Sequence, residues 1–438
     1  MAFDSAAIFP MTAGVSHDDH LTLGGCDVID LVSNYGTPLY VFDEHTFRSM
    51  CREFVDEFGL RYPSTRVVYA SKAFINPALA RLVQEENLGI DVASGGELAV
   101  AQAVGFPPEL IYFHGNNKSQ DELRMALDYG VGRIVVDSFH EMDLLNELAR
   151  SRRTVQDVMV RLSPGVDPHT HAKTATGVLD SKFGFSIETG DGAKAIHHAL
   201  EASYLHLVGV HFHLGSPIFE LEPYSTAIDA VLTFVAPFKS EGLELVEFSP
   251  GGGFAIGYLH DQLPPPIGSY AEVISSAMTA RCADLGLDEP LLTVEPGRAI
   301  VGRAGVALYT VGGIKEIPSV RKYVSLDGGM GDNIRPALYE ARYEAVVANR
   351  MSDAPAETVT LAGKYCESGD ILIRDIKLPE LESGDVMAVP ASGAYAPSMA
   401  STYNLNPRPA VVMVNGGEAR LIRRRETYED LMLRDVLD

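Results

Sequence analysis

The sequence predicts an α/β plus β architecture, in which a closed (β/α)8 barrel of the TIM type precedes an antiparallel β domain. Three observations predict it. Eight short apolar segments alternate with segments of helical periodicity from residue 66 to about residue 302, as in parallel sheets that are buried on both faces. This region is close to the roughly 250 residues of a typical eight-fold barrel. After residue 304, short strand-like segments separated by turns take over.

The eight apolar segments are rich in Val, Ile, Leu and aromatic residues, and most end at Gly, Ser, His or a charged residue. In chain order they are Arg66–Ser71, Gly89–Ala93, Leu110–Phe113, Arg133–Val136, Asp157–Leu162, Leu207–His213, Leu245–Ser249 and Leu291–Glu295. An open doubly wound sheet is the alternative arrangement. The sequence has no Gly-x-Gly-x-x-Gly fingerprint, which favours the closed barrel.

Helices are expected between these strands because apolar residues recur there at helical spacing. Clear examples are Asn76–Asn87, Lys118–Gly130 and Phe139–Arg150. Ser119 and Glu122 have the three-residue offset of a capping box. The sequence therefore predicts a helix that begins after Ser119.

The pattern of short apolar segments separated by turns predicts a separate β domain in the C-terminal part of the chain. Its strands are expected at 306–314, 322–329, 343–350, 357–363, 370–378, 385–390 and 410–415, and residues 38–42 have a similar composition. We therefore expect an N-terminal segment over 1–40 that packs with the β domain, a barrel over 41–303, and a C-terminal β-barrel or sandwich domain over 304–438.

Composition excludes several classes of partner. The chain has 35 Lys and Arg against 59 Asp and Glu, a formal net charge of −24. Such a surface repels phosphate backbones and anionic lipid, so neither nucleic acid nor membrane is an expected partner. The N-terminus does not have the pattern of a signal peptide, and no apolar run approaches the roughly 20 residues of a membrane span. Four widely spaced cysteines without a Cys-x-x-Cys pair suit a reducing compartment, so a cytoplasmic location is expected.

Functional residues of such a barrel gather at the carboxyl ends of its strands. Lys72 ends the first strand, and a lysine amine can form a Schiff base with a carbonyl cofactor or substrate. Gly251–Gly253 would let backbone N–H groups approach a phosphate closely, and Arg298 follows the next strand. Glu295 would face the same opening, where a carboxylate can keep a pyridine nitrogen protonated. Together these residues predict a phosphorylated ligand.

A metal site is the competing interpretation of this opening. His211 and His213 alternate along one predicted strand, so both side chains would share a face. A metal would need further ligands from other strand ends, for which His114 and Asp137 are candidates. Lys72 and the glycines have no role in a metal site, so no metal is expected.

Ten motifs in chain order carry a resemblance to a known family. They are Tyr69-Ala-Ser-Lys72-Ala, Asp91-Val-Ala-Ser94-Gly-Gly-Glu97, His114-Gly-Asn-Asn-Lys-Ser119, Ser181-Lys-Phe-Gly-Phe185, His211-Phe-His213-Leu-Gly-Ser216, Gly251-Gly-Gly-Phe254, Glu295-Pro-Gly-Arg298, Arg335-Pro-Ala-Leu-Tyr339, Cys366-Glu-Ser-Gly-Asp370 and Gly393-Ala-Tyr395. With these residues the chain resembles the diaminopimelate decarboxylases, relatives of ornithine decarboxylase and alanine racemase. The resemblance runs from about residue 28 to residue 420.

The resemblance implies a barrel that binds pyridoxal phosphate (PLP). Lys72 would hold PLP covalently, His213 would stack on its ring and take part in catalysis, and Glu295 would pair with the ring nitrogen. The remaining cofactor contacts implied by the resemblance, around the phosphate, are Ser216, Gly253, Arg298 and Tyr395.

The resemblance also implies how an amino-acid substrate is held. The implied contacts to its distal carboxylate are Arg298, Arg335 and Tyr339, and Tyr395 is a further implied substrate contact. Glu367 would bind the distal ammonium, and Cys366 would be the acid that protonates the carbanion. Family members are homodimers, so each active site would take Cys366 and Glu367 from the other subunit.

The implied reaction is the decarboxylation of meso-2,6-diaminopimelate to L-lysine and carbon dioxide, the last step of lysine biosynthesis. The residue types agree with it. Glu295 favours a strong electron sink, and Arg335 offers a planar fork for a distal carboxylate. The alternatives are a sister decarboxylase for carboxynorspermidine or a D-amino acid, and a non-catalytic PLP-binding regulator.

Three positions depart from the family pattern. Lys364-Tyr365 replaces a usual Pro-x before Cys366, and Ala396-Pro397 follows Tyr395 where Gly-Phe or Gly-Tyr is usual. Asn406 stands where Arg is frequent. All three border the expected substrate side.

Overall fold

The computed structural model describes residues 4–167 and 181–436. The chain divides into two compact units, each built from separate segments. Residues 51–255 and 265–297 form the barrel unit, whereas residues 1–50, 256–264 and 298–438 form the β unit. The domain limits expected from the sequence, 1–40, 41–303 and 304–438, remain a prediction, because these two units are defined by contacts between residues and not by continuous stretches of the chain.

The barrel unit contains eight parallel strands, one for each segment predicted from the sequence. They are β5 (Thr65–Ala70), β6 (Gly89–Val92), β7 (Ile111–Phe113), β8 (Arg133–Val136), β9 (Gln156–Ser163), β11 (Leu205–His211), β12 (Glu247–Gly251) and β13 (Leu291–Val294). Each strand pairs with the next, and β13 pairs with β5 through the register Leu292 to Thr65. This closes the ring, so the closed-barrel prediction is confirmed.

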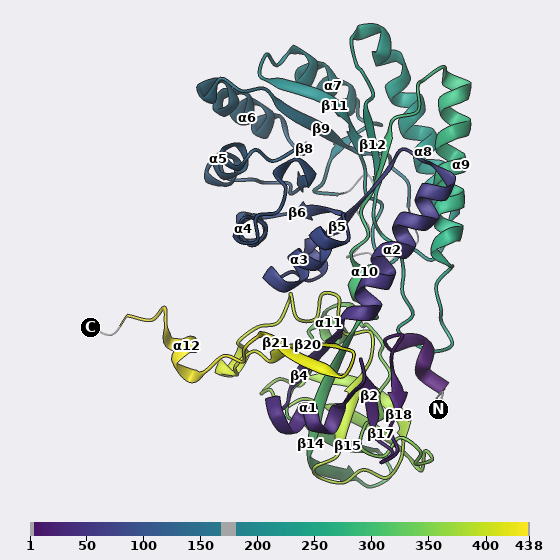
Figure 1. Cartoon of the computed structure of the whole chain (residues 1–438), viewed down its shortest axis with the longest axis vertical. Coiled ribbons are helices and arrows are strands. Elements are labelled where there is room, and N and C mark those ends of the chain that lie inside the picture. Colours follow the sequence, from purple (N-terminus) through teal and green to yellow (C-terminus); the bar gives the residue numbers. More distant parts are fainter. Residues whose placement is uncertain (1–3, 168–180, 437–438) are drawn as a thin grey trace. The chain divides into compact units, whose positions relative to one another are not determined.

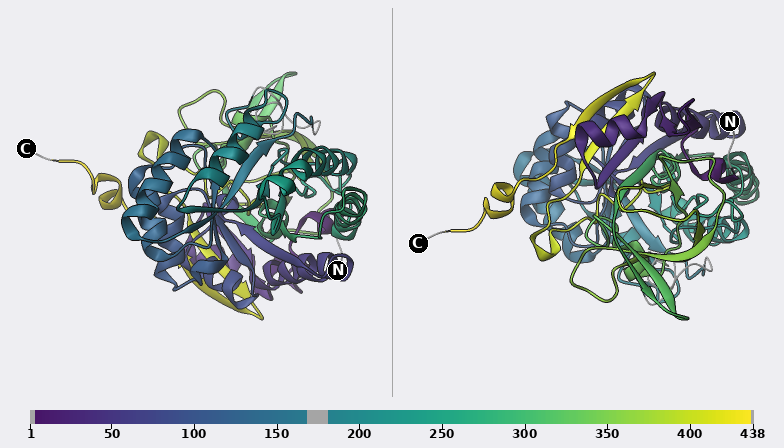
Figure 2. Two further views of the ribbon diagram at one scale, coloured as in Figure 1. Left: turned by 90° about the horizontal axis from the view of Figure 1, so that it is seen from above. Right: turned by 90° about the horizontal axis from the view of Figure 1, so that it is seen from below.

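Helices surround the strands, as Figures 1 and 2 show. They are α3 (Pro77–Glu85), α4 (Gly95–Ala103), α5 (Gln120–Tyr129), α6 (Phe139–Arg152), α7 (Asp191–Glu201), α8 (Glu222–Val235) and α9 (Ile267–Leu285). Shorter elements of this unit are η2 (Ser71–Ala73), η3 (Pro108–Leu110), η4 (Ala236–Glu241) and β10 (Phe185–Ser186). The capping box predicted at Ser119 and Glu122 is present and starts α5.

The barrel interior is layered along its axis. A middle layer is apolar and consists of Val68, Tyr112, Val135, Met159 and Val208. Polar residues lie on both sides of it: one set at the amino ends of the strands and one at the carboxyl ends. The apolar layer therefore separates two polar clusters with different neighbours.

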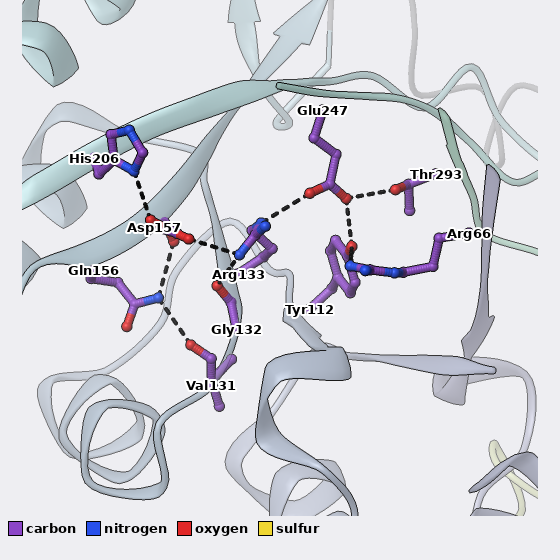
Figure 3. Close-up of polar contacts among 10 residues, drawn as sticks. All are labelled: Arg66, Tyr112, Val131, Gly132, Arg133, Gln156, Asp157, His206, Glu247 and Thr293. Atoms are coloured by element: carbon purple, nitrogen blue, oxygen red, sulfur yellow. Dashed lines mark hydrogen bonds and ion pairs between the residues drawn. The ribbon is translucent and has the colours of Figure 1, made fainter. Parts of the chain in front are cut away.

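The polar cluster at the amino ends centres on Glu247, which is fully buried (Figure 3). Its carboxylate accepts hydrogen bonds from Tyr112 and Thr293, both at 2.5 Å, and from Arg133 at 2.9 Å. Arg133 also donates to Asp157 at 2.9 Å. Since β7 and β12 lie on opposite sides of the ring, the bond from Tyr112 to Glu247 crosses the barrel.

The β unit contains a sheet with the order β18-β17-β15-β14-β4-β20-β21, in which β19 pairs with β14 and β16. The strands are β4 (Leu39–Asp43), β14 (Gly305–Ile317), β15 (Arg321–Leu326), β16 (Val346–Val347), β17 (Glu357–Ala362), β18 (Ile371–Leu378), β19 (Val386–Val389), β20 (Ala410–Asn415) and β21 (Glu418–Arg423). Most pairs are antiparallel, but β15 with β17 and β20 with β4 are parallel. The expected antiparallel domain is therefore confirmed as an antiparallel-rich sheet.

The N-terminal residues contribute to the core of the β unit. They form η1 (Asp4–Ile8), β1 (Gly14–Val15), β2 (Leu21–Leu23), β3 (Cys26–Asp27) and α1 (Val28–Tyr35), followed by β4. Phe9 and Leu23 share one apolar cluster with Val41, Leu308 and Val412. Helix α2 (Glu44–Arg61) then leads into the barrel unit, and the remaining helical elements of the β unit are α10 (Arg298–Val301), α11 (Arg335–Tyr339), η5 (Tyr403–Leu405) and α12 (Tyr428–Met432).

Among the described residues, no helix is both long enough and apolar enough to cross a membrane.

Candidate active site

The carboxyl ends of the barrel strands collect the polar residues that the sequence singled out. Lys72 lies in η2 directly after β5, and its side chain is exposed. Its ammonium lies close enough to Asp91 and His213 to act on both electrostatically. Burial raises the pKa of Asp91, and the neighbouring His114 and Lys72 partly offset this rise. The predicted lysine therefore has a carboxyl group and an imidazole within electrostatic reach.

Glu295 is held by contacts with three neighbouring side chains. Its Oε2 atom lies 3.1 Å from His211 Nε2, and its Oε1 atom accepts a hydrogen bond from Ser249 at 2.9 Å. His114 Nε2 lies 3.4 Å from Oε1. Burial opposes ionisation, but His211 and His114 outweigh it and hold the pKa of Glu295 well below its ordinary value. Glu295 is therefore a fixed acceptor at the strand ends.

His211 is the neutral donor to that carboxylate. Burial, the largest cause, lowers the pKa of His211 to about 4. The sequence placed His211 and His213 on one strand face, but β11 ends at His211 and His213 follows it in a loop. Beyond His211 the chain forms no further strand until an isolated bridge between Ile218 and Phe254.

Gly251–Gly253 form a tight loop against this segment. Gly251 and Gly253 have φ values of +74° and +104°, which favour glycine. A Cβ atom at Gly252 would lie 2.1 Å from the Glu295 carbonyl oxygen. One at Gly253 would lie 2.5 Å from the Gly215 carbonyl oxygen, which places the loop of Ser216 beside it. Only glycines allow this close approach of backbones.

His213 is oriented by the same loop. Its Nδ1 atom accepts a hydrogen bond from the Gly252 N–H group at 3.2 Å. Burial, together with the positive charges of Lys72 and Arg161, lowers the pKa of His213 well below its ordinary value. A neutral His213 that accepts at Nδ1 carries its proton at Nε2.

Arg161 and Asp137 complete the polar end of the barrel. Arg161 is buried, lies 3.7 Å from Asp137 Oδ2, and has its guanidinium carbon 4.4 Å from the centre of the Phe183 ring. Asp137 accepts a hydrogen bond from the Gly184 N–H group at 2.5 Å. These contacts tie the Ser181–Phe185 motif to the strand ends.

Several buried polar atoms at this end lack a hydrogen-bond partner within the described part of the chain. They are Ser71 Oγ, Asp91 Oδ1, His114 Nε2, Asp137 Oδ2 and His211 Nδ1. Buried polar groups are normally satisfied, so such a set indicates a polar ligand. With the glycine loop and Glu295, these residues fit PLP: the loop for its phosphate and the carboxylate for its ring nitrogen.

The structure brings together only some of the residues that the sequence offered as metal ligands. His114, His211 and Glu295, not His213 or Asp137, bring ligand atoms within 4.8 Å of one another. Arg161 acts electrostatically on His211 and Glu295 of this group, and Lys72 acts on the neighbouring His213 and Asp91. Two neighbouring positive charges disfavour a divalent cation at this position.

The β unit holds a second group of the predicted residues. Arg298 and Arg335 are only 6% and 5% exposed. The guanidinium carbon of Arg298 lies 4.7 Å from the centre of the Tyr395 ring, and that of Arg335 lies 4.7 Å from the centre of the Tyr258 ring. Tyr339 ends α11, the short helix that begins with Arg335. Arg298, Arg335, Tyr339 and Tyr395 thus belong to one region of this unit.

Arg335 is a buried cation without a carboxylate partner among the described residues. Its guanidinium donates to the Tyr343 hydroxyl, and the aromatic rings of Tyr258 and Tyr343 lie beside it. A buried guanidinium is costly unless an anion pairs with it. The arrangement therefore indicates an anionic ligand.

Cys366 and Glu367 lie in an exposed turn of the β unit. The Cys366 N–H group donates to Asn404 Oδ1 at 2.8 Å, and Glu367 Oε1 accepts from the Gly369 N–H group at 3.2 Å. Two departures from the family pattern flank this turn. Tyr365 is buried and stacks on Tyr403, and Asn406 donates to the Tyr403 carbonyl.

Sequence reasoning missed four residues that support these groups. They are Ser249, which donates to Glu295, His211 in its role as a donor, and Tyr258 and Tyr343 around Arg335. Alternation along β12 could have placed Ser249 on the inner face. The two tyrosines carried no comparable signal.

Comparison with known proteins agrees with this geometry. Residues 45–302 match the model of the pyridoxal-dependent decarboxylase family, pyridoxal binding domain. The diaminopimelate decarboxylase of Bacillus subtilis is 47% identical over 97% of both chains, and that of Mycobacterium leprae is 46% identical over 94% of this chain and 89% of its own.

Solved structures give the same result. The diaminopimelate decarboxylase of M. jannaschii superposes with a TM-score of 0.92 at 37% identity, over 98% of both chains. The Helicobacter pylori enzyme, complexed with L-lysine, superposes with a TM-score of 0.84 at 31% identity, over 93% of this chain and 98% of its own. The chain therefore belongs to the diaminopimelate decarboxylase family of pyridoxal-dependent decarboxylases.

Proposed function

We propose that this protein decarboxylates meso-2,6-diaminopimelate to L-lysine and carbon dioxide, the last step of lysine biosynthesis. The observation that carries the proposal is Arg335, a buried guanidinium that contacts Tyr343 and the Tyr258 ring and has no carboxylate partner among the described residues. A substrate with a distal carboxylate supplies the missing anion, because guanidinium and carboxylate pair through two parallel hydrogen bonds. Ornithine and lysine have no distal carboxylate.

The barrel residues prepare the reacting end. When bound, PLP withdraws the electrons that the departing carboxylate leaves at Cα. Lys72 is the residue for its covalent attachment. Glu295, held by His211 and Ser249, would keep a proton on the ring nitrogen, and His213 would lie against the ring. Ser216 and Gly253 would bind the phosphate, with Arg298 and Tyr395 contributing to both phosphate and substrate binding.

The β-unit residues would select the distal end. Arg298, Arg335 and Tyr339 would bind the carboxylate, Tyr395 would also contact the substrate, and Glu367 would bind the ammonium group. Cys366 would deliver the proton that replaces the carboxylate at Cα. An exposed thiol in a polar turn suits a proton donor better than a buried one would.

A panel experiment tests the proposed function. Carbon dioxide release should be measured with added PLP for meso-diaminopimelate, its stereoisomers, carboxynorspermidine, L-lysine and L-ornithine. We expect meso-diaminopimelate to have the highest kcat/KM. A higher value for carboxynorspermidine or a D-amino acid would identify a sister decarboxylase, and no release from any compound would indicate a PLP-binding regulator.

Arg335→Lys should separate carboxylate binding from chemistry. The substitution keeps a positive charge but loses the planar fork, so KM for meso-diaminopimelate should rise about 10- to 100-fold with a smaller loss in kcat. The inhibition constant of 1,5-diaminopentane, a diamine without a carboxylate, should change much less. Equal changes for both compounds would remove Arg335 from the carboxylate site.

We also propose a homodimer with shared active sites, in a cytoplasmic location. The exposed position of Cys366 and Glu367 supports the dimer, as does the C-terminal segment. There, Tyr428 and Leu433 are 70% and 80% exposed, as large apolar side chains at a subunit contact would be before association. The four widely spaced cysteines without a Cys-x-x-Cys pair support the location.

Mixing two inactive variants tests whether sites are shared. Lys72→Ala and Cys366→Ala homodimers should both be nearly inactive. A mixed dimer contains one site with neither substitution if Cys366 comes from the other subunit, so activity should recover to at most about half of wild type per heterodimer. No recovery, with subunit exchange confirmed by mass spectrometry, would place Cys366 in its own chain's site or outside catalysis.

A further inference from the structure

Tyr258 lies in residues 256–264, the segment that leaves the barrel sequence between β12 and α9 and joins the β unit. Neither the sequence motifs nor the family resemblance assigned it a role. Its hydroxyl accepts a hydrogen bond from Arg298 Nη1 at 2.6 Å. The face of its ring lies beside Arg335, whose guanidinium carbon is 4.7 Å from the ring centre. One side chain therefore contacts both buried guanidinium groups.

The position of the Tyr258 ring is fixed from two further sides. Tyr343 meets it edge to face, with ring centres 5.3 Å apart and planes at 82°. The Tyr343 hydroxyl also accepts a hydrogen bond from Arg335. Two residues further along, His260 contacts Glu344 through its N–H group at 2.9 Å and through Nδ1 at 2.7 Å. The loop that carries Tyr258 is thus attached beside Tyr343.

This arrangement addresses a physical difficulty. Two buried guanidinium groups that serve one anion repel each other before the anion arrives, and burial strengthens this repulsion. A tyrosine can offset it at both groups, by its hydroxyl oxygen as acceptor and by the electron-rich face of its ring. Although burial opposes ionisation, the two arginines lower the pKa of Tyr258, which agrees with a strong mutual attraction.

We propose that Tyr258 is a positioning residue that holds Arg298 and Arg335 in a fixed arrangement for the distal carboxylate of the substrate. This inference rests on the proposed function, because it assigns these arginines to that carboxylate. Holding the guanidinium groups in place before binding lowers the entropy cost of binding. Tyr258 should therefore affect affinity for the distal carboxylate more than the rate of the bound substrate.

Two substitutions at Tyr258 separate its two contacts. Tyr258→Phe removes the hydroxyl contact to Arg298 but keeps the ring beside Arg335, whereas Tyr258→Leu removes both. For the PLP-loaded enzyme, we expect KM for meso-diaminopimelate to rise about tenfold in Tyr258→Phe and further in Tyr258→Leu. The kcat value should stay within about twofold of wild type, since the reacting end is untouched.

The inhibition constant of 1,5-diaminopentane is the second readout, because this diamine has an amine for the reacting end and no carboxylate, whereas the product L-lysine keeps the distal carboxylate. It should stay near the wild-type value in both variants. A matched control is Tyr323→Phe, a tyrosine beside Arg321 elsewhere in the β unit, with the guanidinium carbon 5.9 Å from the ring centre. That variant should change neither constant.

The outcomes are distinct. An equal rise in KM and in the inhibition constant of 1,5-diaminopentane, or a fall in kcat at constant KM, would overturn the positioning role. If Tyr258→Leu does not fold, judged by circular dichroism, the result for Tyr258→Phe decides alone. If wild-type enzyme does not decarboxylate meso-diaminopimelate, the proposed function fails, which is a separate result from a failure of Tyr258.

Discussion

Lys72→Ala is expected to lower carbon dioxide release by on the order of 10⁴-fold or more, as loss of a covalent catalytic residue does in other enzymes. The substitution removes the amine for covalent attachment of PLP at an exposed position directly after β5. The variant should therefore fold normally and retain non-covalent affinity for PLP.

Borohydride reduction followed by peptide mass spectrometry checks this prediction independently of turnover. In the wild-type protein, reduction should leave the pyridoxyl group on Lys72, and in Lys72→Ala no lysine should carry it. Lys194→Ala is a matched control, since Lys194 is an exposed lysine of the same unit that pairs with Asp191 at 2.8 Å. An adduct at another lysine, or stoichiometric zinc without PLP, would contradict the assignment.

Glu247→Ala is expected to have the largest effect on stability. The substitution leaves Arg133, Tyr112 and Thr293 without their shared acceptor inside the barrel (Figure 3). Breaking a buried ion pair by removing one partner costs about 3–5 kcal/mol. Arg133 keeps its ion pair with Asp157 at 2.9 Å, but Tyr112 and Thr293 also lose their buried acceptor. The free energy of unfolding of the barrel unit should fall by about this amount, measured by urea titration with circular dichroism.

The comparison with a surface pair makes this prediction specific. Asp191→Ala breaks the exposed pair with Lys194 and should change the unfolding free energy far less, because water screens that pair. At temperatures where Glu247→Ala is folded, its KM should match wild type, because the apolar layer separates Glu247 from the carboxyl-end cluster. A loss below about 1 kcal/mol would show that Arg133 finds water or another acceptor.

The two predictions concern opposite ends of the barrel: Lys72 follows the carboxyl end of β5, and Glu247 lies at the amino end of β12. In a barrel, the carboxyl ends carry function and the amino ends carry stability. Strand β12 illustrates this division: it begins at Glu247, in the stabilising network, and ends at Gly251, in the glycine loop. Substitutions along one strand of five residues are therefore expected to change from effects on stability to effects on ligand binding.

Local patterns in the sequence were sufficient to predict the barrel and to propose Lys72 as the residue that binds PLP covalently. The eight strands and the capping box at Ser119 depend on residues that are neighbours in the chain, so apolar runs and a three-residue offset reveal them. Lys72 and Glu295 could also be predicted from the sequence, because each lies at the end of an apolar run and the end of a strand is a local property of the chain.

The tertiary structure alone decided which side chains support those residues. Tyr112 and Glu247 are 135 positions apart, and His211 and Glu295 are 84 apart, so only closure of the barrel brings each pair together. Likewise, β4 inserts between β14 and β20, and Tyr258 joins Arg298 and Arg335 from a segment within the barrel sequence. Hydrophobic periodicity records whether a residue faces inward. It does not record which distant residue it meets, because that partner is set by strand order, register and side-chain reach.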